Sequence, residues 1–507
     1  MATLDPKERR IKKLEEILGV AKAMSTERDL GVLLEEIVEH ARSVVEATRG
    51  SIFLLDKDKN ELWSKVAQGA REIRFPADKG IAGHVAQTKK PLNIPDAYAD
   101  PRFNPAVDKA TGFHTRNMLT VPMLSTKEEV VGVLQVLNKN PGDHAAEVEK
   151  GSPGPPFDAE DEEMLLALGG QAASAIENAI LYDEINKLFE GFIAASVVAI
   201  ESRDPTTSGH SGRVATLTCG LAEVIDRVET GPFASTTFDY DQMKEIRYAS
   251  LLHDFGKVGV REDVLVKAKK LPALRLELIR LRAEILKRGL ELRYAKQKLG
   301  RLLRGARDGF EAQAAMWDLE LAALLGEIDT HLSTVGAANE PTVMPADAAA
   351  GLHSIAIRAF VDHLGESHTV ITPEEAEILS IPRGSLTLEE FRQIQSHVLH
   401  TFEFLKRIPW TKELRHIPEI ASSHHEKLNG SGYPEGRRGV QIPLQSRMMT
   451  VSDIFDALTA SDRPYKTAVP VERALDILDQ ERKAGALDSD VFNLFIDLKP
   501  WEAASRS

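Results

Sequence analysis

The sequence predicts a multi-domain fold in which an α+β sensor domain is joined by a long helix to an all-α domain that carries a helical insertion. The first supporting observation is length, since 507 residues at ~150 per domain correspond to roughly three domains. The second is that strand-type segments are confined to residues 50–137. The third is that apolar residues beyond Glu201 recur at helical spacing, apart from loops near Pro205 and Gly231 and at 430–443.

Charge and cysteine content exclude several classes of function. The chain has 63 Lys and Arg against 77 Asp and Glu, a net charge of −14, which argues against bulk binding of nucleic acid or anionic lipid. The single cysteine, Cys219, rules out intrachain disulfides and zinc sites built on several thiolates. The longest stretch without a formal charge, 164–176, is shorter than the ~20 apolar residues of a membrane span. We therefore expect a cytoplasmic protein without a membrane span, whose metals are held by His, Asp and Glu.

The sensor domain is expected at residues 29–157, after an N-terminal helix at 1–28. Helical spacing of apolar residues extends over 4–48. Aliphatic and β-branched runs bounded by turn residues then predict four strands, at 50–55, 61–66, 118–124 and 130–137. The Gly-, Pro- and Asp-rich segment 78–110 is expected to cross between them with one short helix near 82–88, a mixture typical of an α+β domain.

A proline-free segment at 158–200 predicts one long connecting helix. Its apolar residues recur every three or four positions, namely Leu165, Leu168, Ala172, Ala175, Ala179, Tyr182 and Ile185. Two interpretations stay open at this point. The helix either packs on its own domain, or it forms a parallel coiled coil that joins two copies in a homodimer.

The all-α domain is expected at 201–266 and 382–490, interrupted by a helical insertion at 267–381 and followed by a C-terminal tail at 491–507. From Lys267 to Arg307 the insertion has 14 Lys or Arg against 3 Glu. Apolar residues there lie at helical spacing, namely Leu274, Leu278, Leu281, Ile285, Leu292, Leu299 and Leu303. A predominantly acidic helix at 310–332 follows, so we favour a hairpin of a basic and an acidic helix. Binding of the basic helix to a membrane surface or to nucleic acid is the alternative.

Histidines and carboxylates of the second half fall into short clusters: Asp204 with His210, His253 with Asp254, His397, His424 with His425, and Asp453. Neutral imidazoles with one or two carboxylates suit Fe, Mn or Zn. Two metal ions a few ångströms apart are a common solution for cleaving phosphodiesters. The clusters therefore predict a metal site, although each of them alone is a weak signal.

The order of these clusters resembles the HD-GYP family, a subgroup of HD-superfamily phosphohydrolases that hydrolyse the bacterial second messenger cyclic di-GMP. Three motifs carry the resemblance: His253-Asp254 with Gly256-Lys257, the run HHEKLNGSGYP from His424 to Pro434, and VSDIFDALTASDRPYK from Val451 to Lys466. The resemblance implies metal-dependent hydrolysis to pGpG, with a second cleavage to GMP left open. The alternative is a catalytically weak receptor or scaffold for the dinucleotide.

Residue by residue, the resemblance implies seven metal ligands, namely His210, His253, Asp254, His397, His424, His425 and Asp453. Asp254 is expected to bridge two divalent ions, Fe or Mn, and to be catalytic together with Lys257. Thr206 stands where some members have the glutamate of a third metal site, so we expect two metals. Substrate contacts are implied at Lys257, Gly432, Tyr433, Arg463 and Lys466.

The front domain resembles a GAF domain of the type found in cyclic nucleotide phosphodiesterases. The resemblance rests on DKGIAGHVAQTKKPLNIPDAYADPRFNP (78–105), on DKATGFHT (108–115), and on Asn138-Lys139 followed by Phe157 and Asp161-Glu162. It implies a structural pair of Lys139 with Asp161. It also implies a pocket for cAMP or cGMP, with contacts at Ser51, Ile81, Ala82, Asp108, Thr111, Thr115 and Gln135. The alternative is a GAF domain that binds no nucleotide and serves as a packing module.

Overall fold

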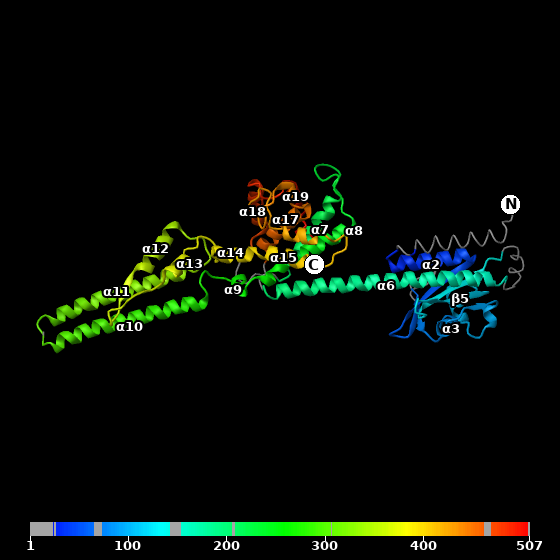
Figure 1. Ribbon diagram of the computed structural model, residues 1–507, viewed down its shortest axis with the longest axis horizontal. Helices are drawn as coiled ribbons and strands as arrows, with labels where there is room; N and C mark the ends of the chain where they lie inside the picture. The colour runs from blue at the N-terminus through cyan, green and yellow to red at the C-terminus, as the bar shows by residue number, and fades with distance from the viewer. Residues whose placement is uncertain are drawn as a thin grey trace. The chain divides into compact units, whose positions relative to one another are not determined.

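The computed structural model describes residues 24, 27–64, 73–141, 154–204, 208–305, 307–460 and 468–504. Its contacts divide into two units, Met1–Gly191 and Phe192–Ser507 (Figure 1), and each is described by itself. The expected N-terminal helix at 1–28 lies outside the described residues, except for residues 24, 27 and 28. The described helix α2 (Leu30–Val44) begins after Asp29, whose carboxylate accepts a hydrogen bond from the Val32 amide.

The first unit is built on a six-stranded antiparallel sheet of order β3-β2-β1-β6-β5-β4. The strands are β1 (Ala47–Asp56), β2 (Glu61–Ser64), β3 (Ile73–Pro76), β4 (Leu92–Ile94), β5 (Met118–Leu124) and β6 (Val130–Lys139). All four strands expected from the sequence are present. Strands β3 and β4 were not expected, because three or four residues are too few to display an alternating pattern.

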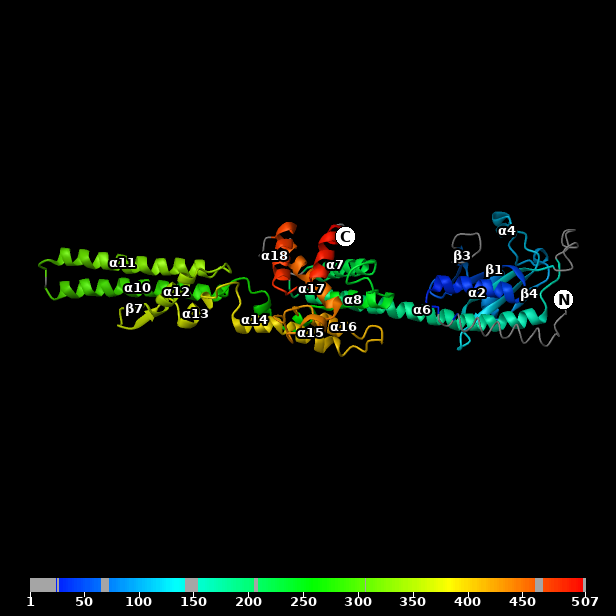
Figure 2. The ribbon, with the colours of Figure 1, turned by 90° about the horizontal axis from the view of Figure 1, so that it is seen from above.

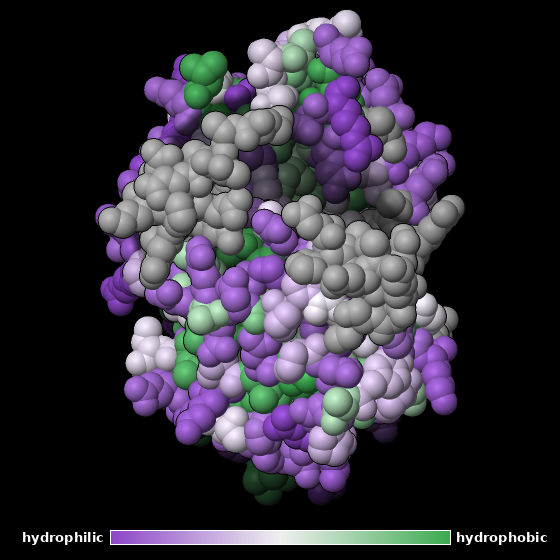
Figure 3. Space-filling view, turned by 90° about the vertical axis from the view of Figure 1, so that its right-hand side faces the viewer, coloured by the Kyte–Doolittle hydropathy of each residue, from purple (hydrophilic) through white to green (hydrophobic). Residues whose placement is uncertain are grey.

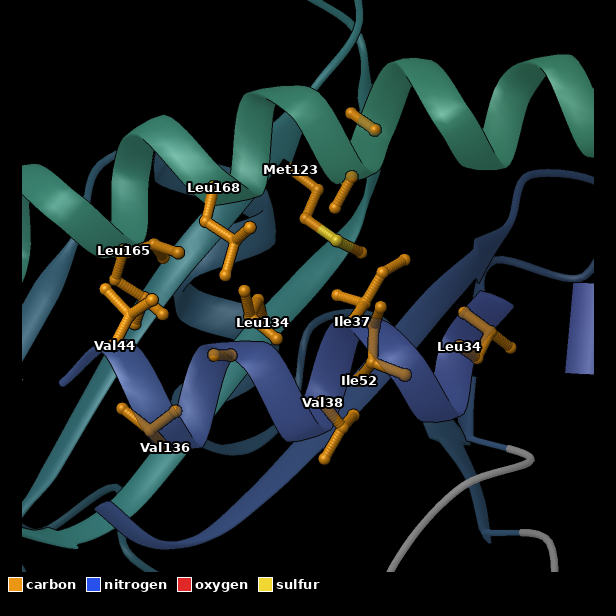
Figure 4. Close-up of a cluster of buried hydrophobic side chains, with 14 of the residues drawn as sticks. Leu34, Ile37, Val38, Val44, Ile52, Met123, Leu134, Val136, Leu165 and Leu168 are labelled. Atoms are coloured by element: carbon orange, nitrogen blue, oxygen red, sulfur yellow. The ribbon is translucent and has the colours of Figure 1, made fainter. Parts of the chain in front are cut away.

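Helices α2 and α6 (Ala159–Glu201) cover one face of this sheet (Figure 4). Leu34, Ile37 and Val44 of α2 belong to the same buried cluster as Leu165 and Leu168 of α6. The opposite face is covered by α3 (Gly80–Thr88) through a second buried cluster. Three further elements belong to this unit, the 3-10 turn η1 (Ala97–Ala99), helix α4 (Pro105–Thr111) and the segment between them. The α+β class is thereby confirmed.

Helix α6 has two halves of different character. In the first half Leu165, Leu168, Ala172, Ala175 and Ala179 are all buried in the core of the sheet, so here the helix packs on its own domain. In the second half Leu181, Ile185 and Leu188 are 54%, 65% and 76% exposed, and the helix is buried again at Ile193 and Ile200. Packing on its own domain therefore holds for the first part of this helix, and the coiled coil stays a prediction for the segment around Leu181, Ile185 and Leu188.

Among the described residues, α6 is also the one helix that is long and apolar enough to cross a membrane. Its most apolar 18-residue window has a mean hydropathy of 1.3, and half of that window is buried inside the protein. A core helix passes the same test, so this is weak evidence for a span. Figure 3 views the protein from the right-hand side of Figure 1, and hydrophilic side chains dominate that face with small hydrophobic patches between them.

The second unit contains a helical domain and the insertion. The domain is formed by α7 (His210–Ile225), α8 (Tyr240–Leu252), η4 (Phe255–Gly259), α9 (Glu262–Leu265), α14 (Leu388–Gln395), α15 (His397–Leu405), α16 (Ile417–Ser422), η5 (Gly439–Gln441), α17 (Leu444–Thr459) and α18 (Val471–Lys483). The segment 491–507, expected as a tail, instead contains most of α19 (Ser489–Leu498) and all of α20 (Trp501–Ala504). Val491, Phe492 and Phe495 are buried in the domain core, which is why the chain stays folded there.

The insertion consists of α10 (Ala273–Leu303), α11 (Phe310–Ala338), α12 (Ala346–Ile357), the two-stranded hairpin of β7 (Ala359–Val361) and β8 (Ser367–Thr369), and α13 (Pro373–Leu379). Helices α10 and α11 lie side by side as a hairpin (Figure 2), joined by ion pairs such as Lys287 with Asp329 at 2.5 Å. The hairpin of strands was not expected. The insertion has a core of its own, which includes Ile279, Leu286 and Leu290.

The leucines that the sequence pattern singled out on α10 are not in that core. Leu274, Leu281 and Ile285 are 71%, 55% and 72% exposed. The helix has two apolar stripes, and spacing alone does not tell which of them is buried.

Candidate metal centre

The seven expected ligands lie at helix ends or, in one case, inside a helix. They are His210 at the start of α7, His253 and Asp254 after α8, His397 at the start of α15, His424 and His425 after α16, and Asp453 within α17. Six of them are buried and His425 is half-buried. The structure thus brings together residues that are more than 240 positions apart in the chain.

The ligand atoms form two neighbouring groups. His397, His424 and His425 form one group, and His210, His253 and Asp254 form the other, with the atoms of each group within 4.8 Å of one another. Asp254 faces both groups, because its Oδ1 lies 3.3 Å from Nε2 of His397 and its Oδ2 lies 3.5 Å from Nε2 of His253. This is the position expected of a carboxylate that bridges two ions.

Asp453 also lies between the two groups, which the sequence did not indicate. Its Oδ1 is 3.2 Å from Nε2 of His210, and its Oδ2 is 3.9 Å from Nδ1 of His425. The centre therefore has two carboxylates that can contact both groups. Two shared carboxylates would hold two cations close together with less mutual repulsion than one.

Three histidines present unpaired nitrogen atoms to the centre. Nε2 of His253, His397 and His424 is buried and has no hydrogen-bond partner among the described residues. Their Nδ1 atoms lie 2.6–2.7 Å from the carbonyl oxygens of Ser250, Ile394 and Ala421. An Nδ1–H that donates to a carbonyl leaves the Nε2 lone pair available, as in metal-ligating histidines. Since buried polar atoms are rarely left unpaired, the donor set fits bound metal ions.

Burial keeps these imidazoles neutral. It lowers the pKa of both His397 and His424 to about 4, despite the opposing attraction of Asp254. His253 is shifted in the same direction for the same reason. Neutral imidazole is the form that binds a cation, so these side chains are ready to ligate at neutral pH.

The glycine of the His253-Asp254 motif is required by packing. A Cβ atom on Gly256 would lie 1.8 Å from the carbonyl oxygen of His397, so η4 contacts α15 backbone to backbone. Thr401 secures the same junction, because its Oγ1 accepts from the Gly256 amide at 2.8 Å and donates to the His253 carbonyl at 3.0 Å. This close contact places His397 beside Asp254.

His210 is supported by an ion pair that sequence analysis did not assign to the site. Nδ1 of His210 lies 2.7 Å from Asp456, whose carboxylate also accepts two hydrogen bonds from Arg213 at 2.6 and 3.1 Å. Burial lowers the pKa of His210, but hydrogen bonds to Asp453 and Asp456 outweigh it and raise the pKa to about 9. The signal in the sequence is spacing, since Asp456 follows Asp453 by three residues on the same helical face.

Lys257 lies half-buried beside Asp254. Its Nζ lies 2.8 Å from Asp254 and 3.2 Å from Asp204. Burial would lower the pKa of Lys257, but these two carboxylates raise it above its ordinary value. For Asp254, burial would raise the pKa, but Lys257 and the histidines hold it well below the ordinary value. A fixed cation and a fixed anion therefore stand together at the centre.

The loop after His425 brings Tyr433 to the site. The Tyr433 ring lies 4.8 Å from that of His425, and burial raises the phenol pKa, so the hydroxyl stays protonated. A Cβ atom on Gly432 would lie 2.5 Å from the His425 carbonyl oxygen, so only glycine fits there. Buried Glu426 holds the loop by accepting from the amides of Glu435 and Arg437 at 2.8 and 2.9 Å. Sequence analysis did not assign Glu426 to the site, although it stands within the HHEKLNGSGYP run.

Arg463, Lys466 and Thr206 fall outside the described residues. Glu201 does not approach the centre. Its carboxylate accepts from the amides of Gly209 and Ser211 at 2.8 and 3.3 Å, which caps the start of α7 and thereby positions His210.

The first unit contains a separate cavity of about 430 Å³. Six of the seven contacts implied by the GAF resemblance line it, namely Ser51, Ile81, Ala82, Asp108, Thr115 and Gln135. The seventh, Thr111, is the last residue of α4, the helix whose residue Asp108 lines the cavity. Aromatic rings and cationic side chains share the lining, among them Phe53, Phe75, Phe103, Phe113, Arg49 and Lys79.

Two polar side chains of this cavity have hydrogen-bond partners within the protein. The two carboxylate oxygens of Asp108 accept from the amide and hydroxyl of Thr115 at 2.6 and 2.7 Å. The amide of Gln135 donates to Thr120 at 3.0 Å. Away from the cavity, Lys139 pairs with buried Asp161, the pair implied by the resemblance. Asp108 and Gln135 are therefore paired without a ligand.

Two known families match parts of the chain. Residues 29–176 match the GAF domain, and residues 362–491 match the HD domain. The chain carries a GAF domain followed by an HD domain. The HD domain is a phosphohydrolase-type domain, and the matched part holds His397, His424, His425 and Asp453. The GAF match continues into α6 as far as residue 176, in agreement with the buried first half of that helix.

Similar proteins were found for parts of the chain. A probable 3′,5′-cyclic phosphodiesterase, pde-5 of Caenorhabditis elegans, is 31% identical over 188 residues, which are 34% of this chain and 24% of that protein. The chain thus spans about a quarter of the length of this relative. Among solved structures, GAF domains of phosphoenolpyruvate-protein phosphotransferases from Coxiella burnetii and Acinetobacter are 18% and 19% identical. Each covers 34% of this chain and 98% of its own, with TM-scores of 0.29 and 0.28.

Proposed function

We propose that the protein is a cyclic di-GMP phosphodiesterase of the HD-GYP type, which hydrolyses its substrate to pGpG with two divalent ions, Fe or Mn. The observation that carries the proposal is the set of buried, unpaired Nε2 atoms of His253, His397 and His424 around Asp254. When bound, the two ions would supply Lewis acidity and an activated water for attack on phosphorus. The seven predicted ligands would hold them.

Lys257 and Tyr433 are proposed to contact the substrate directly, with a positive charge and a hydrogen-bond donor. The ammonium of Lys257, fixed 2.8 Å from Asp254, stabilises the negative charge that develops on the phosphate oxygens. The protonated phenol of Tyr433, beside His425, donates a hydrogen bond to a phosphate oxygen or a guanine acceptor. Gly432 lets the loop approach closely enough for this contact. Arg463 and Lys466 are proposed to bind phosphate and guanine, and a second cleavage to GMP at the same site is proposed as the slower step.

The GAF cavity is proposed to regulate this activity by binding cAMP or cGMP. Its mixture of aromatic rings with Arg49, Arg102 and Lys79 suits a flat base attached to an anionic phosphate. The signal would pass along α6, whose exposed Leu181, Ile185 and Leu188 are proposed to pair with α6 of a second copy in a homodimer.

A 3′,5′-cyclic mononucleotide is the second candidate substrate, favoured by the similarity to the cyclic phosphodiesterase of C. elegans. The deciding experiment incubates metal-loaded protein with cyclic di-GMP, cAMP and cGMP and separates the products by chromatography. We expect pGpG from cyclic di-GMP at a far higher kcat/KM than for either mononucleotide. Preferential hydrolysis of a mononucleotide would replace the first proposal by the second, and binding without turnover would leave a receptor.

A further inference from the structure

Helix α10 of the insertion has a second apolar face that the described chain leaves largely exposed. One face, with Ile279, Ala283, Leu286 and Leu290, is buried in the core of the insertion. The other face is exposed, and we call its seven residues the α10 seam. They are Leu274 (71% exposed), Leu278 (50%), Leu281 (55%), Ile285 (72%), Leu292 (42%), Leu299 (56%) and Leu302 (43%). So many exposed aliphatic side chains in one stripe are unusual on a monomer and typical of an interaction surface.

The spacing of the α10 seam is that of a coiled coil. Steps of alternately four and three residues lead from Leu274 to Leu302, and only Arg288 and Ala295 on this path are not large and apolar. The path covers four heptads, about 42 Å at 1.5 Å per residue. An a/d pattern sustained over four heptads predicts pairing with another helix along its whole length.

The charged residues on both edges of the α10 seam indicate which helix can pair with it and in which orientation. All three glutamates of α10, Glu277, Glu284 and Glu291, are seven residues apart and occupy g positions, which end with Lys298. The opposite edge, at the e positions, carries Arg275, Arg282, Gly289, Lys296 and Leu303. In a parallel pair of identical helices, each g position meets the e position of the next heptad in its partner, so Glu277 would meet Arg282 and Glu291 would meet Lys296. In an antiparallel pair, like edges meet, so the glutamates near the middle of the two helices would face one another.

We propose that the α10 seam pairs with the α10 seam of a second copy of this chain, parallel and in register. The acidic edge disfavours an anionic membrane surface as the occupant, because a membrane-binding helix carries cations on both flanks of its apolar face. The clearest contact between copies is Glu291 with Lys296 of the other helix. Arg288, held by Glu291 at 2.7 Å, is a charged core position of the kind that fixes register at a cost in stability.

The basic edge is partly shielded by the insertion itself. A Cβ atom on Gly289 would lie 3.3 Å from Cβ of Asp362, so the β7–β8 hairpin closes that position. Arg282 donates to Glu375 at 2.9 Å, which leaves Lys296 as the e-position cation best placed to reach a second copy. The hairpin and α13 thus border the seam on one side and leave its a and d positions open.

Cysteine cross-linking of the full-length protein tests the proposal. In a Cys219→Ala background, Leu281→Cys places one thiol at a core position that faces its own copy in a parallel, in-register pair. Exposed Arg280→Cys, one residue away on another face, is the matched control. We expect mild oxidation to link most of the Leu281→Cys chains into dimers and few of the Arg280→Cys chains. Adding Ile285→Asp and Leu292→Asp should abolish the link while circular dichroism stays unchanged.

Cross-linking separates this interface from the pairing proposed for α6, since dimer mass alone would not. Absence of a link at Leu281→Cys would overturn the proposal. A link formed only when Leu281→Cys and Leu299→Cys chains are mixed would overturn the parallel orientation. Sedimentation with phosphatidylserine vesicles that depends on Ile285 and Leu292, without cross-linking, would replace the second copy by a membrane surface.

Discussion

The metal centre and the GAF cavity differ in how far their own side chains satisfy one another. At the metal centre, the Nε2 atoms of three buried histidines lack hydrogen-bond partners among the described residues, and a bound cation would give them one. In the GAF cavity, Asp108 is satisfied by Thr115, and Gln135 donates to Thr120. Unpaired buried nitrogen atoms indicate a specific kind of ligand, a cation, whereas the GAF cavity, in which Asp108 and Gln135 already have partners, is characterised by its aromatic and cationic lining.

The largest effect is expected when the unpaired site is dismantled. His253→Ala with Asp254→Ala removes a ligand of one group and a carboxylate that faces both, so bound metal and hydrolysis should both be lost, turnover falling by at least about a thousandfold. Elemental analysis and product chromatography measure the two effects. The exposed His353→Ala is the control and should keep both. Normal turnover by the double variant would break the assignment of the site.

Lys257 tests whether the centre also contains groups that act without binding metal. Lys257→Met keeps the length of the side chain but removes its charge, so kcat should fall about 10²–10³-fold, the loss typical of one group that stabilises developing charge. Metal content, measured on the same preparation, should stay at the wild-type level. Loss of metal together with activity would mean that Lys257 serves to position Asp254 and does not contact the phosphate.

Support of a ligand from outside the centre should matter less. Asp456→Asn weakens the contact to Nδ1 of His210 and the ion pair with Arg213 but keeps the shape of the side chain, so metal affinity should fall about 10- to 100-fold. Titration with a competing chelator measures the affinity. Full activity at saturating metal would agree with this role, whereas activity that metal cannot restore would assign Asp456 to the reaction itself.

In the metal-free protein, the buried histidines should make the free energy of unfolding depend on pH. The folded-state pKa of His397 and His424 is about 4, below the ~6.5 of an unfolded chain, so the unfolded state binds more protons between these values. Their contribution to the free energy of unfolding is complete above pH ~6.5 and is lost as pH falls toward 4. Urea denaturation between pH 7 and 4.5 measures the slope. His424→Gln should flatten it, and an unchanged slope would contradict the shift.

The sequence predicted the two domains because their motifs are contiguous. HHEKLNGSGYP and the GAF motifs predict the local course of the backbone and the order of the ligands along the chain. The α+β and all-α classes were predicted from the spacing of apolar residues. Asp456, Glu426 and Arg213 were not assigned to the site, because their roles depend on contacts such as that between residues 210 and 456, which no local pattern records. The same limit explains α10, where two apolar stripes compete and only packing selects the buried one.

The smallest effect on stability is expected for a substitution in the GAF cavity. Its result would show how far the cavity differs from the metal centre. Gln135→Leu removes one hydrogen bond to Thr120, and the apolar side chain suits a lining rich in Phe, so the free energy of unfolding should change by less than about 1 kcal/mol. If the cavity binds a cyclic nucleotide through Gln135, the affinity for cAMP or cGMP in calorimetry should fall at least about tenfold, the loss typical of one hydrogen bond to a ligand. Wild-type protein that binds neither nucleotide would assign the cavity to packing, since Asp108 and Gln135 already have partners.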